Sequence, residues 1–200
     1  MKTFVHNING SLFSATAEEA LTPQIQTLFQ ILENIPSEKI RDGFSIEIGW
    51  TVFFLSLKDD TYFILAPDFQ KDPFADQTED LTLSLWVQLE QTHFLRLHNV
   101  TGESVRFSDK VIAAKQALTE DEITLQRFSD CSKGDSGWCI ESLSNRECDE
   151  YEAYYAYQLL KHRPSLIKAL ALPFEYMVIF DRDNIKAIIN ENDENILDSE

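Results

Sequence analysis

The chain has 200 residues, of which 44% are hydrophobic and 12% aromatic, and its formal net charge is −17. That much apolar material excludes an acidic disordered chain, because a core can be built from it. A surface so acidic repels phosphate backbones and anionic lipid, which excludes nucleic acid and membranes as partners and favours basic proteins. Three cysteines, an odd count, argue against a disulfide framework and favour a cytoplasmic location.

The negative charge is spread along the chain, with 9 basic and 16 acidic side chains up to residue 115 and 8 and 18 after it. This distribution excludes a neutral domain with an acidic tail. We expect one compact unit over residues 1–200. If this unit consists of two lobes, the boundary between them is expected near residues 118–122. The segments so defined are an N-terminal lobe (1–118), a C-terminal lobe (119–190) and a solvated acidic tail (191–200).

In the first half of the chain, Thr22-Pro23 predicts the N-cap and first turn of a helix. Apolar residues at 25, 28, 29 and 32 continue this helix at the expected spacing. Alternation predicts a strand over 44–50, and a hairpin follows it. The remaining elements expected here are hairpin strands at 52–57 and 62–66, a polar loop at 67–80, a strand at 81–89 whose alternate residues are Leu or Val, and a short helix at 93–98.

The second half of the chain mixes strands and short helices without βαβ units. Ser108 is expected to cap a helix over 109–117, and Pro164 to separate two later helices. The elements expected here are strands at 123–128 and 137–142, helices at 154–161 and 164–170, and a terminal hairpin at 176–180 and 185–189. The order of elements indicates an α+β fold of mostly antiparallel sheets with packed helices.

Gly134-Asp135-Ser136-Gly137 matches the nucleophile motif of chymotrypsin-like proteases. That chemistry also needs a histidine base oriented by an aspartate, and no histidine stands in the sequence setting that those proteases use. Four turn-forming residues before a strand explain the motif equally well. A hydrolase that uses Ser136 or a carboxylate cluster therefore stays an alternative to a non-enzymatic role.

The sequence predicts no metal site and no cofactor. The three cysteines are separated by seven and eight residues, far from the spacing of zinc knuckles. Together with His162 the cysteines could form a ligand set, but unpaired thiols are the simpler interpretation. Asp181-Arg182-Asp183 is similar to an acidic metal-binding triplet. Because it lies between two apolar strands, a hairpin turn is the simpler interpretation.

Three blocks of the chain, read together, resemble a known family. The blocks are 67–74 leading into 79–85, the tetrad Asp135-Ser136-Gly137-Trp138, and 157–166 followed by 172–173 and 176–180. Their order and spacing are similar to immunity family 33 of bacterial polymorphic-toxin systems, and the resemblance covers roughly residues 44–190. Glu175 departs from the pattern, because a small turn residue such as glycine is expected before the last hairpin.

The resemblance implies a cytoplasmic bacterial protein that protects its producer by binding a cognate toxin, with no catalytic residue to transfer. The tetrad is then a family marker of structural character, in which Gly137 permits a turn and Trp138 anchors a strand in the core. A basic toxin domain is the expected partner. The candidate partner-binding residues are Asp76, Glu79, Asp80, Glu147, Asp149, Glu150, Tyr151, Glu152 and Tyr155. An acidic regulatory module with another protein partner is a further alternative.

Overall fold

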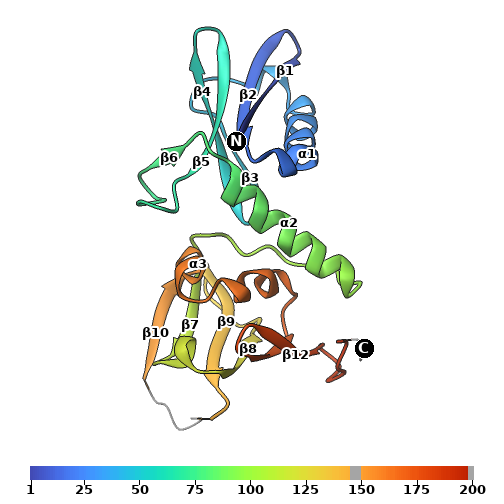
Figure 1. Ribbon diagram of the computed structural model, residues 1–200, viewed down its shortest axis with the longest axis vertical. Coiled ribbons are helices and arrows are strands. Elements are labelled where there is room, and N and C mark those ends of the chain that lie inside the picture. The colour runs from blue at the N-terminus through green and yellow to red at the C-terminus, as the bar shows by residue number, and fades with distance from the viewer. Residues whose placement is uncertain (145–149, 198–200) are drawn as a thin grey trace. The chain divides into compact units, whose positions relative to one another are not determined.

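A computed structural model describes residues 1–144 and 150–197 of the chain (Figure 1). The chain divides into two compact units, Met1–Leu89 and Glu90–Glu200, and each is described by itself. Residues 118–122 lie within the second unit, and a lobe boundary there stays a prediction. Within the described residues, no helix combines the length and the apolar character needed to cross a bilayer.

The first unit is a six-stranded sheet with one long helix against it (Figure 1). Its strand order is β1-β2-β5-β4-β3, with β6 paired to β5, and only the β2–β5 pair is parallel. The strands are β1 (Lys2–Ile8), β2 (Ser11–Ala17), β3 (Ser45–Ile48), β4 (Thr51–Lys58), β5 (Thr61–Pro67) and β6 (Gln77–Thr78); short turns η1 (Glu19–Leu21) and η2 (Ser37–Lys39) flank the helix α1 (Thr22–Glu33). The predicted strand before the hairpin and the β4–β5 hairpin itself are confirmed.

Helix α1 is confirmed, and its four predicted apolar residues are all buried. The N-cap prediction was wrong by one position, because Leu21 is the N-cap and has no side-chain cap bond. Thr22 is instead the first helical residue, and its hydroxyl donates to the Glu19 carbonyl at 2.6 Å. Proline in the first turn costs no hydrogen bond, because the amides there lack intrahelical partners.

The strand predicted at 81–89 was wrong, because these residues begin the helix α2 (Thr82–Leu97). The Asp80 carboxylate accepts the Thr82 amide at 3.0 Å, which supplies a cap for the first turn. Residues 81, 84, 85, 87, 91 and 94 are buried, which is the spacing of a helix face. Leu83 is one of the alternate residues that the strand prediction placed on a single face with Leu81 and Leu85, but it is 39% exposed. The predicted short helix at 93–98 is the end of this same helix.

The second unit is also built on a six-stranded sheet, with strand order β10-β7-β9-β8-β11-β12 (Figure 1). Among the strands that the structure describes here, only the β7–β9 pair is parallel. Its elements are β7 (Lys110–Ala114), η3 (Ala117–Thr119), β8 (Glu122–Arg127), β9 (Asp135–Ser142), β10 (Tyr151–Tyr155), η4 (Ala156–Gln158), α3 (Leu159–His162), η5 (Pro164–Ala171), β11 (Met177–Asp181) and β12 (Asn184–Ile189). The α+β prediction is confirmed, as are β8, β9 and the β11–β12 hairpin.

One helix predicted in this unit was wrong, and another was predicted to begin two residues too early. Residues 109–117 contain strand β7, in which Val111 and Ala113 are buried on one face while Ile112 between them is half-buried. Residues 154–161 begin in strand β10 and become helical only at Ala156. In both places pairing with a neighbouring strand overrides a weak local helix signal. The helix predicted at 164–170 is present as the 3₁₀ helix η5.

Glu175 lies in the turn before β11 with a φ of +66°, in the left-handed region that favours glycine. Its amide donates to the Arg127 carbonyl at 2.8 Å, and its carboxylate accepts the Ser129 amide at 3.1 Å. The hydrogen bond from Ser129 lowers the pKa of the Glu175 carboxyl group. The backbone therefore has the conformation expected of glycine, while the side chain provides a bond that glycine lacks.

We predict that Glu175→Gly is more stable than Glu175→Ala by about 1 kcal/mol, because a Cβ in the left-handed region costs ~1–2 kcal/mol. Both variants lose the bond to Ser129, so the difference between them isolates the backbone cost. Urea unfolding followed by circular dichroism measures it. Equal stability of the two variants would contradict the left-handed assignment.

Candidate functional site

The tetrad Asp135-Ser136-Gly137-Trp138 begins strand β9 at an irregularity of the sheet. The pairing of β7 with β9 shifts register here, since Lys110 pairs with Asp135 but Ile112 pairs with Cys139. The hydroxyl of Ser136 donates to the Lys110 carbonyl at 2.7 Å and accepts the Trp138 amide at 3.2 Å. The Ser136 side chain thus supplies hydrogen bonds at the point where the register shift interrupts the backbone pairing of β7 with β9.

Ser136 has the surroundings of a structural residue. Its side chain is 2% exposed, and its hydroxyl proton is directed to the Lys110 carbonyl. A serine nucleophile needs an exposed oxygen and a base that accepts its proton. The contacts that the structure describes for Ser136 provide neither.

Gly137 occupies a position that no other residue fits. Its φ is +80°, and a Cβ placed on it would lie 2.3 Å from the Phe128 carbonyl oxygen. The close approach is produced by the Phe128 amide, which donates to the Gly137 carbonyl at 2.9 Å. Trp138 follows with its ring in the core, 1% exposed as predicted, and its indole N–H donates to the Leu170 carbonyl in η5 at 3.0 Å.

Arg127, at the end of β8, is 3% exposed and was missed by the sequence reasoning. Its Nε donates to the Ser136 carbonyl at 3.0 Å, and its Nη1 donates to the carbonyls of Glu103 (3.1 Å) and Leu172. The guanidinium carbon lies 4.4 Å from the centre of the Phe174 ring. Burial lowers the pKa of Arg127, but an arginine stays protonated in proteins. A signal was present, because Ile123, Leu125 and Arg127 alternate on one face of the strand.

Arg163 is a second buried arginine, 7% exposed, in the segment that separates α3 from η5. Its guanidinium donates to the carbonyls of Glu120 (2.6 Å), Asp121 (3.2 Å) and Arg182. The residue belongs to one of the blocks that carry the family resemblance. It joins the start of β8 to the turn of the β11–β12 hairpin.

A groove of about 370 Å³ opens beside the tetrad. Its lining comes from β7, from the start of β9 and from the connection between β8 and β9, and consists of Lys110, Ile112, Phe128, Asp130, Cys131, Ser132, Asp135, Gly137, Trp138 and Cys139. Cys131 is exposed, whereas Cys139 is half-buried and burial raises the pKa of its thiol to about 11. Within the described residues, no three His, Cys, Asp or Glu side chains gather closely enough to hold a metal ion. Cys148 lies outside the described residues.

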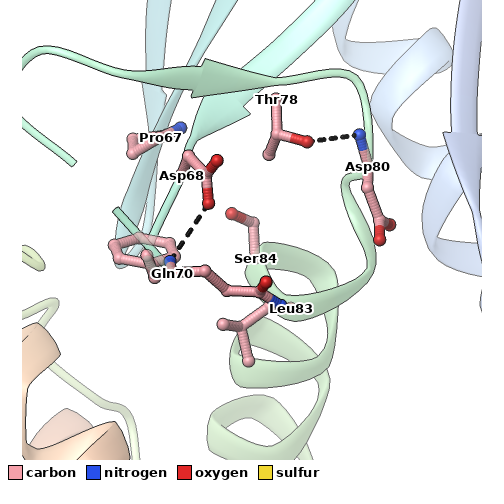
Figure 2. A pocket seen from close by; sticks show the side chains of 8 residues that line it. Pro67, Asp68, Gln70, Thr78, Asp80, Leu83 and Ser84 are labelled. Carbon is pink, nitrogen blue, oxygen red and sulfur yellow. Dashed lines mark hydrogen bonds between the residues drawn. The ribbon is translucent and has the colours of Figure 1, made fainter. Parts of the chain in front are cut away.

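A smaller hollow of about 140 Å³ lies in the first unit, between the 67–70 segment and the start of α2 (Figure 2). Asp80 lines it and caps α2, while Asp76 accepts the Asp72 amide at 3.3 Å. Glu79, which is half exposed, pairs with Lys58 at 3.1 Å. Two of the three predicted acidic residues of this loop thus accept backbone amides, and the third forms an exposed ion pair.

The other predicted surface residues belong to the second unit. Tyr151 and Tyr155 are 48% and 37% exposed on β10, and the Tyr151 hydroxyl donates to Glu141 at 2.7 Å. Glu150 pairs with Lys115, whose hydrogen bond lowers the pKa of the Glu150 carboxyl group. Glu152 is exposed and accepts a hydrogen bond from the Tyr154 hydroxyl. Glu147 and Asp149 lie outside the described residues.

The second unit matches a known protein family. The model of a family described as the Imm33-like domain matches residues 90–191, which is half of the chain and nearly the whole second unit. No curated protein and no solved structure matches the chain.

Gly137→Ala is predicted to destabilise the second unit more than Gly134→Ala does. Both glycines have a positive φ, but a Cβ at Gly134 meets nothing within 4 Å, whereas one at Gly137 meets the Phe128 carbonyl at 2.3 Å. Gly134→Ala should therefore cost ~1–2 kcal/mol of backbone strain alone. Thermal melts of the two variants test the difference, and equal melting temperatures would refute the role of the close approach.

Arg127→Ala should lower the free energy of unfolding by about 3–5 kcal/mol, because it removes a buried cation from carbonyl groups that then lack a donor. Arg96→Ala is the matched control, since Arg96 is exposed on α2 and its replacement should change stability by less than about 0.5 kcal/mol. Denaturant unfolding compares the two. Similar losses in both variants would contradict the structural role of Arg127.

Proposed function

We propose that this chain, which belongs to the Imm33-like family of immunity proteins, binds and neutralises a cognate bacterial toxin without catalysing a reaction. The observation that carries the proposal is the family match across the second unit. An immunity protein of this kind acts by occupying the toxin, so its essential property is a surface complementary to that toxin.

A basic toxin domain is the partner that the charge favours. The chain has twice as many acidic as basic side chains, 34 against 17. Two of the basic residues, Arg127 and Arg163, are buried against carbonyl groups, so the surface is more acidic than the sequence alone implies. Such a surface attracts a cationic partner over long distances and repels nucleic acid and anionic membranes. We assign this steering to exposed carboxylates such as Glu79, Glu150 and Glu152.

A non-enzymatic role is supported by the burial of Ser136, whose hydroxyl bonds to the backbone on both sides. We propose that the whole tetrad is a structural marker, which shapes the start of β9 and touches no substrate. A cytoplasmic location is proposed from the odd number of cysteines, two of which the structure describes as free. The alternative of an acidic regulatory module differs only in the identity of its basic partner.

The test is protection of a host cell. We expect a large toxin with a variable C-terminal domain to be encoded immediately upstream of this chain. That C-terminal domain is expressed from an inducible promoter, alone or together with this chain. Growth should stop in the first case and continue in the second, and the two purified proteins should form a complex. The Ser136→Ala variant should protect as well as the wild type if it folds. Protection without a complex, or its loss in folded Ser136→Ala, would favour an enzyme instead.

The rate of association should also depend on salt. Charge attraction is screened over about 8 Å at physiological ionic strength, so the association rate constant should fall by tenfold or more between low and high salt. The dissociation rate constant should change less, because short-range packing governs it. Stopped-flow mixing across a salt series measures both rates. An association rate constant that does not change with salt concentration would show that the acidity serves solubility instead of recognition.

A further inference from the structure

The two faces of the second sheet have different surroundings. Val111, Ile140 and Val178 point to one face and are fully buried. Side chains alternate along a strand, so their neighbours Ile112 and Ile179 point to the opposite face, where they are partly exposed. Trp138 on the buried face bonds to η5, which shows that the short helices close that side. The opposite side is called the open face below.

Backbone pairing places one row of side chains straight across the open face. Each member is paired with the next on the neighbouring strand, from β10 at one edge to β12 at the other. The row consists of Ala153, Ile112, Cys139, Gln126, Met177 and Ile189. Its residues are apolar except for the exposed Gln126, so the row forms an apolar band across the open face, and Ile179 of the neighbouring row adds to it.

Carboxylates flank this band on both sides. Glu122 pairs with Asp181 and Glu141 pairs with Thr124, which places three carboxylates of the open face on one side of the band. Asp130 and Asp135 line the groove on its other side. An apolar centre with a charged rim is the usual composition of a protein-binding surface.

The groove gives this surface a pocket. Gly137 and Phe128, which is 43% exposed, both line it. Two carboxylates, those of Asp130 and Asp135, and one ammonium group, that of Lys110, line it. The charged group of an arginine or lysine from a partner could pair with these carboxylates, and its aliphatic part could pack against the aromatic ring of Phe128.

We propose that the open face of the second sheet is the surface that binds the toxin, with a basic side chain of the toxin in the groove beside Gly137. The inference rests on the proposed function and adds the place and chemistry of the contact. A basic toxin is the occupant that the carboxylates on both sides of the band favour. A second copy of this chain would bring like charges together and is disfavoured for that reason.

Two substitutions on the open face, each with a control matched in charge change, test the proposal. Gln126→Arg places a cation in the middle of the band, and Gln26→Arg makes the same change on the exposed side of α1 in the first unit. Asp130→Lys reverses a charge in the groove, and Glu38→Lys does so in η2. All four positions are exposed, so the variants should fold, and circular dichroism melts confirm this before binding is measured.

The probe is the purified toxin domain used in the protection experiment. Gln126→Arg and Asp130→Lys should each weaken its binding by about 30-fold or more, as expected for residues central to an interface. The two controls should stay within about threefold of the wild type, since they alter only the overall charge. Equal effects of test and control variants would overturn the proposal, because charge alone would then account for the loss.

Labelling of the unaltered protein gives a second readout. Cys131 lines the groove and is exposed, so a maleimide should modify it quickly in the free protein. In the complex this labelling, resolved by mass spectrometry of the peptide that contains Cys131, should slow at least tenfold. Binding with unchanged labelling and unaffected Gln126→Arg would reject the open face and leave the immunity role intact. No binding by the wild type would reject both.

Discussion

The second unit depends on two guanidinium groups that are buried against main-chain carbonyl oxygens. Burying a charge is costly unless several hydrogen bonds replace the lost water. Arg127 provides them by donating to Glu103, Ser136 and Leu172, and Arg163 by donating to Glu120, Asp121 and Arg182. Most of these carbonyls lie in turns and connections, where sheet pairing supplies no donor. Each arginine therefore joins several connections of the chain and adds to the backbone hydrogen bonds between them, such as that from the Arg182 amide to the Asp121 carbonyl.

This arrangement has a consequence for recognition. The arginines and the indole of Trp138 hold the connections and η5 against the sheet, and the face that we propose for toxin binding lies on the opposite side from Trp138. Strands fixed in this way offer a surface whose shape exists before binding, so less conformational entropy is lost on association. The same burial removes two cations from the surface of an already acidic chain. Stability and charge complementarity thus follow from the same residues.

The sequence allowed the fold class, the β4–β5 and β11–β12 hairpins and helix α1 to be predicted, because these are local patterns bounded by clear turns. The prediction was wrong at α2, where leucines two residues apart have the spacing of a strand, although Asp80 could have been recognised as a helix cap. It failed at β7, whose pairing with β9 and β10 is distant in the chain. The open face was missed for a similar reason, since a row made of one residue from each of six strands has no signature along the sequence. Only Tyr151 and Tyr155, at its edge, were foreseen as exposed.

The most direct test of this account is nuclear magnetic resonance of the arginine side chains in the full chain. The guanidinium N–H groups of Arg127 and Arg163 should give separate signals that exchange with water only on the timescale of unfolding, because carbonyl oxygens hold them and rotation of the guanidinium is blocked. Exposed Arg96 is the internal reference and should exchange rapidly. Exchange of Arg127 and Arg163 as fast as that of Arg96 would contradict the claim that buried guanidinium groups hold this unit together.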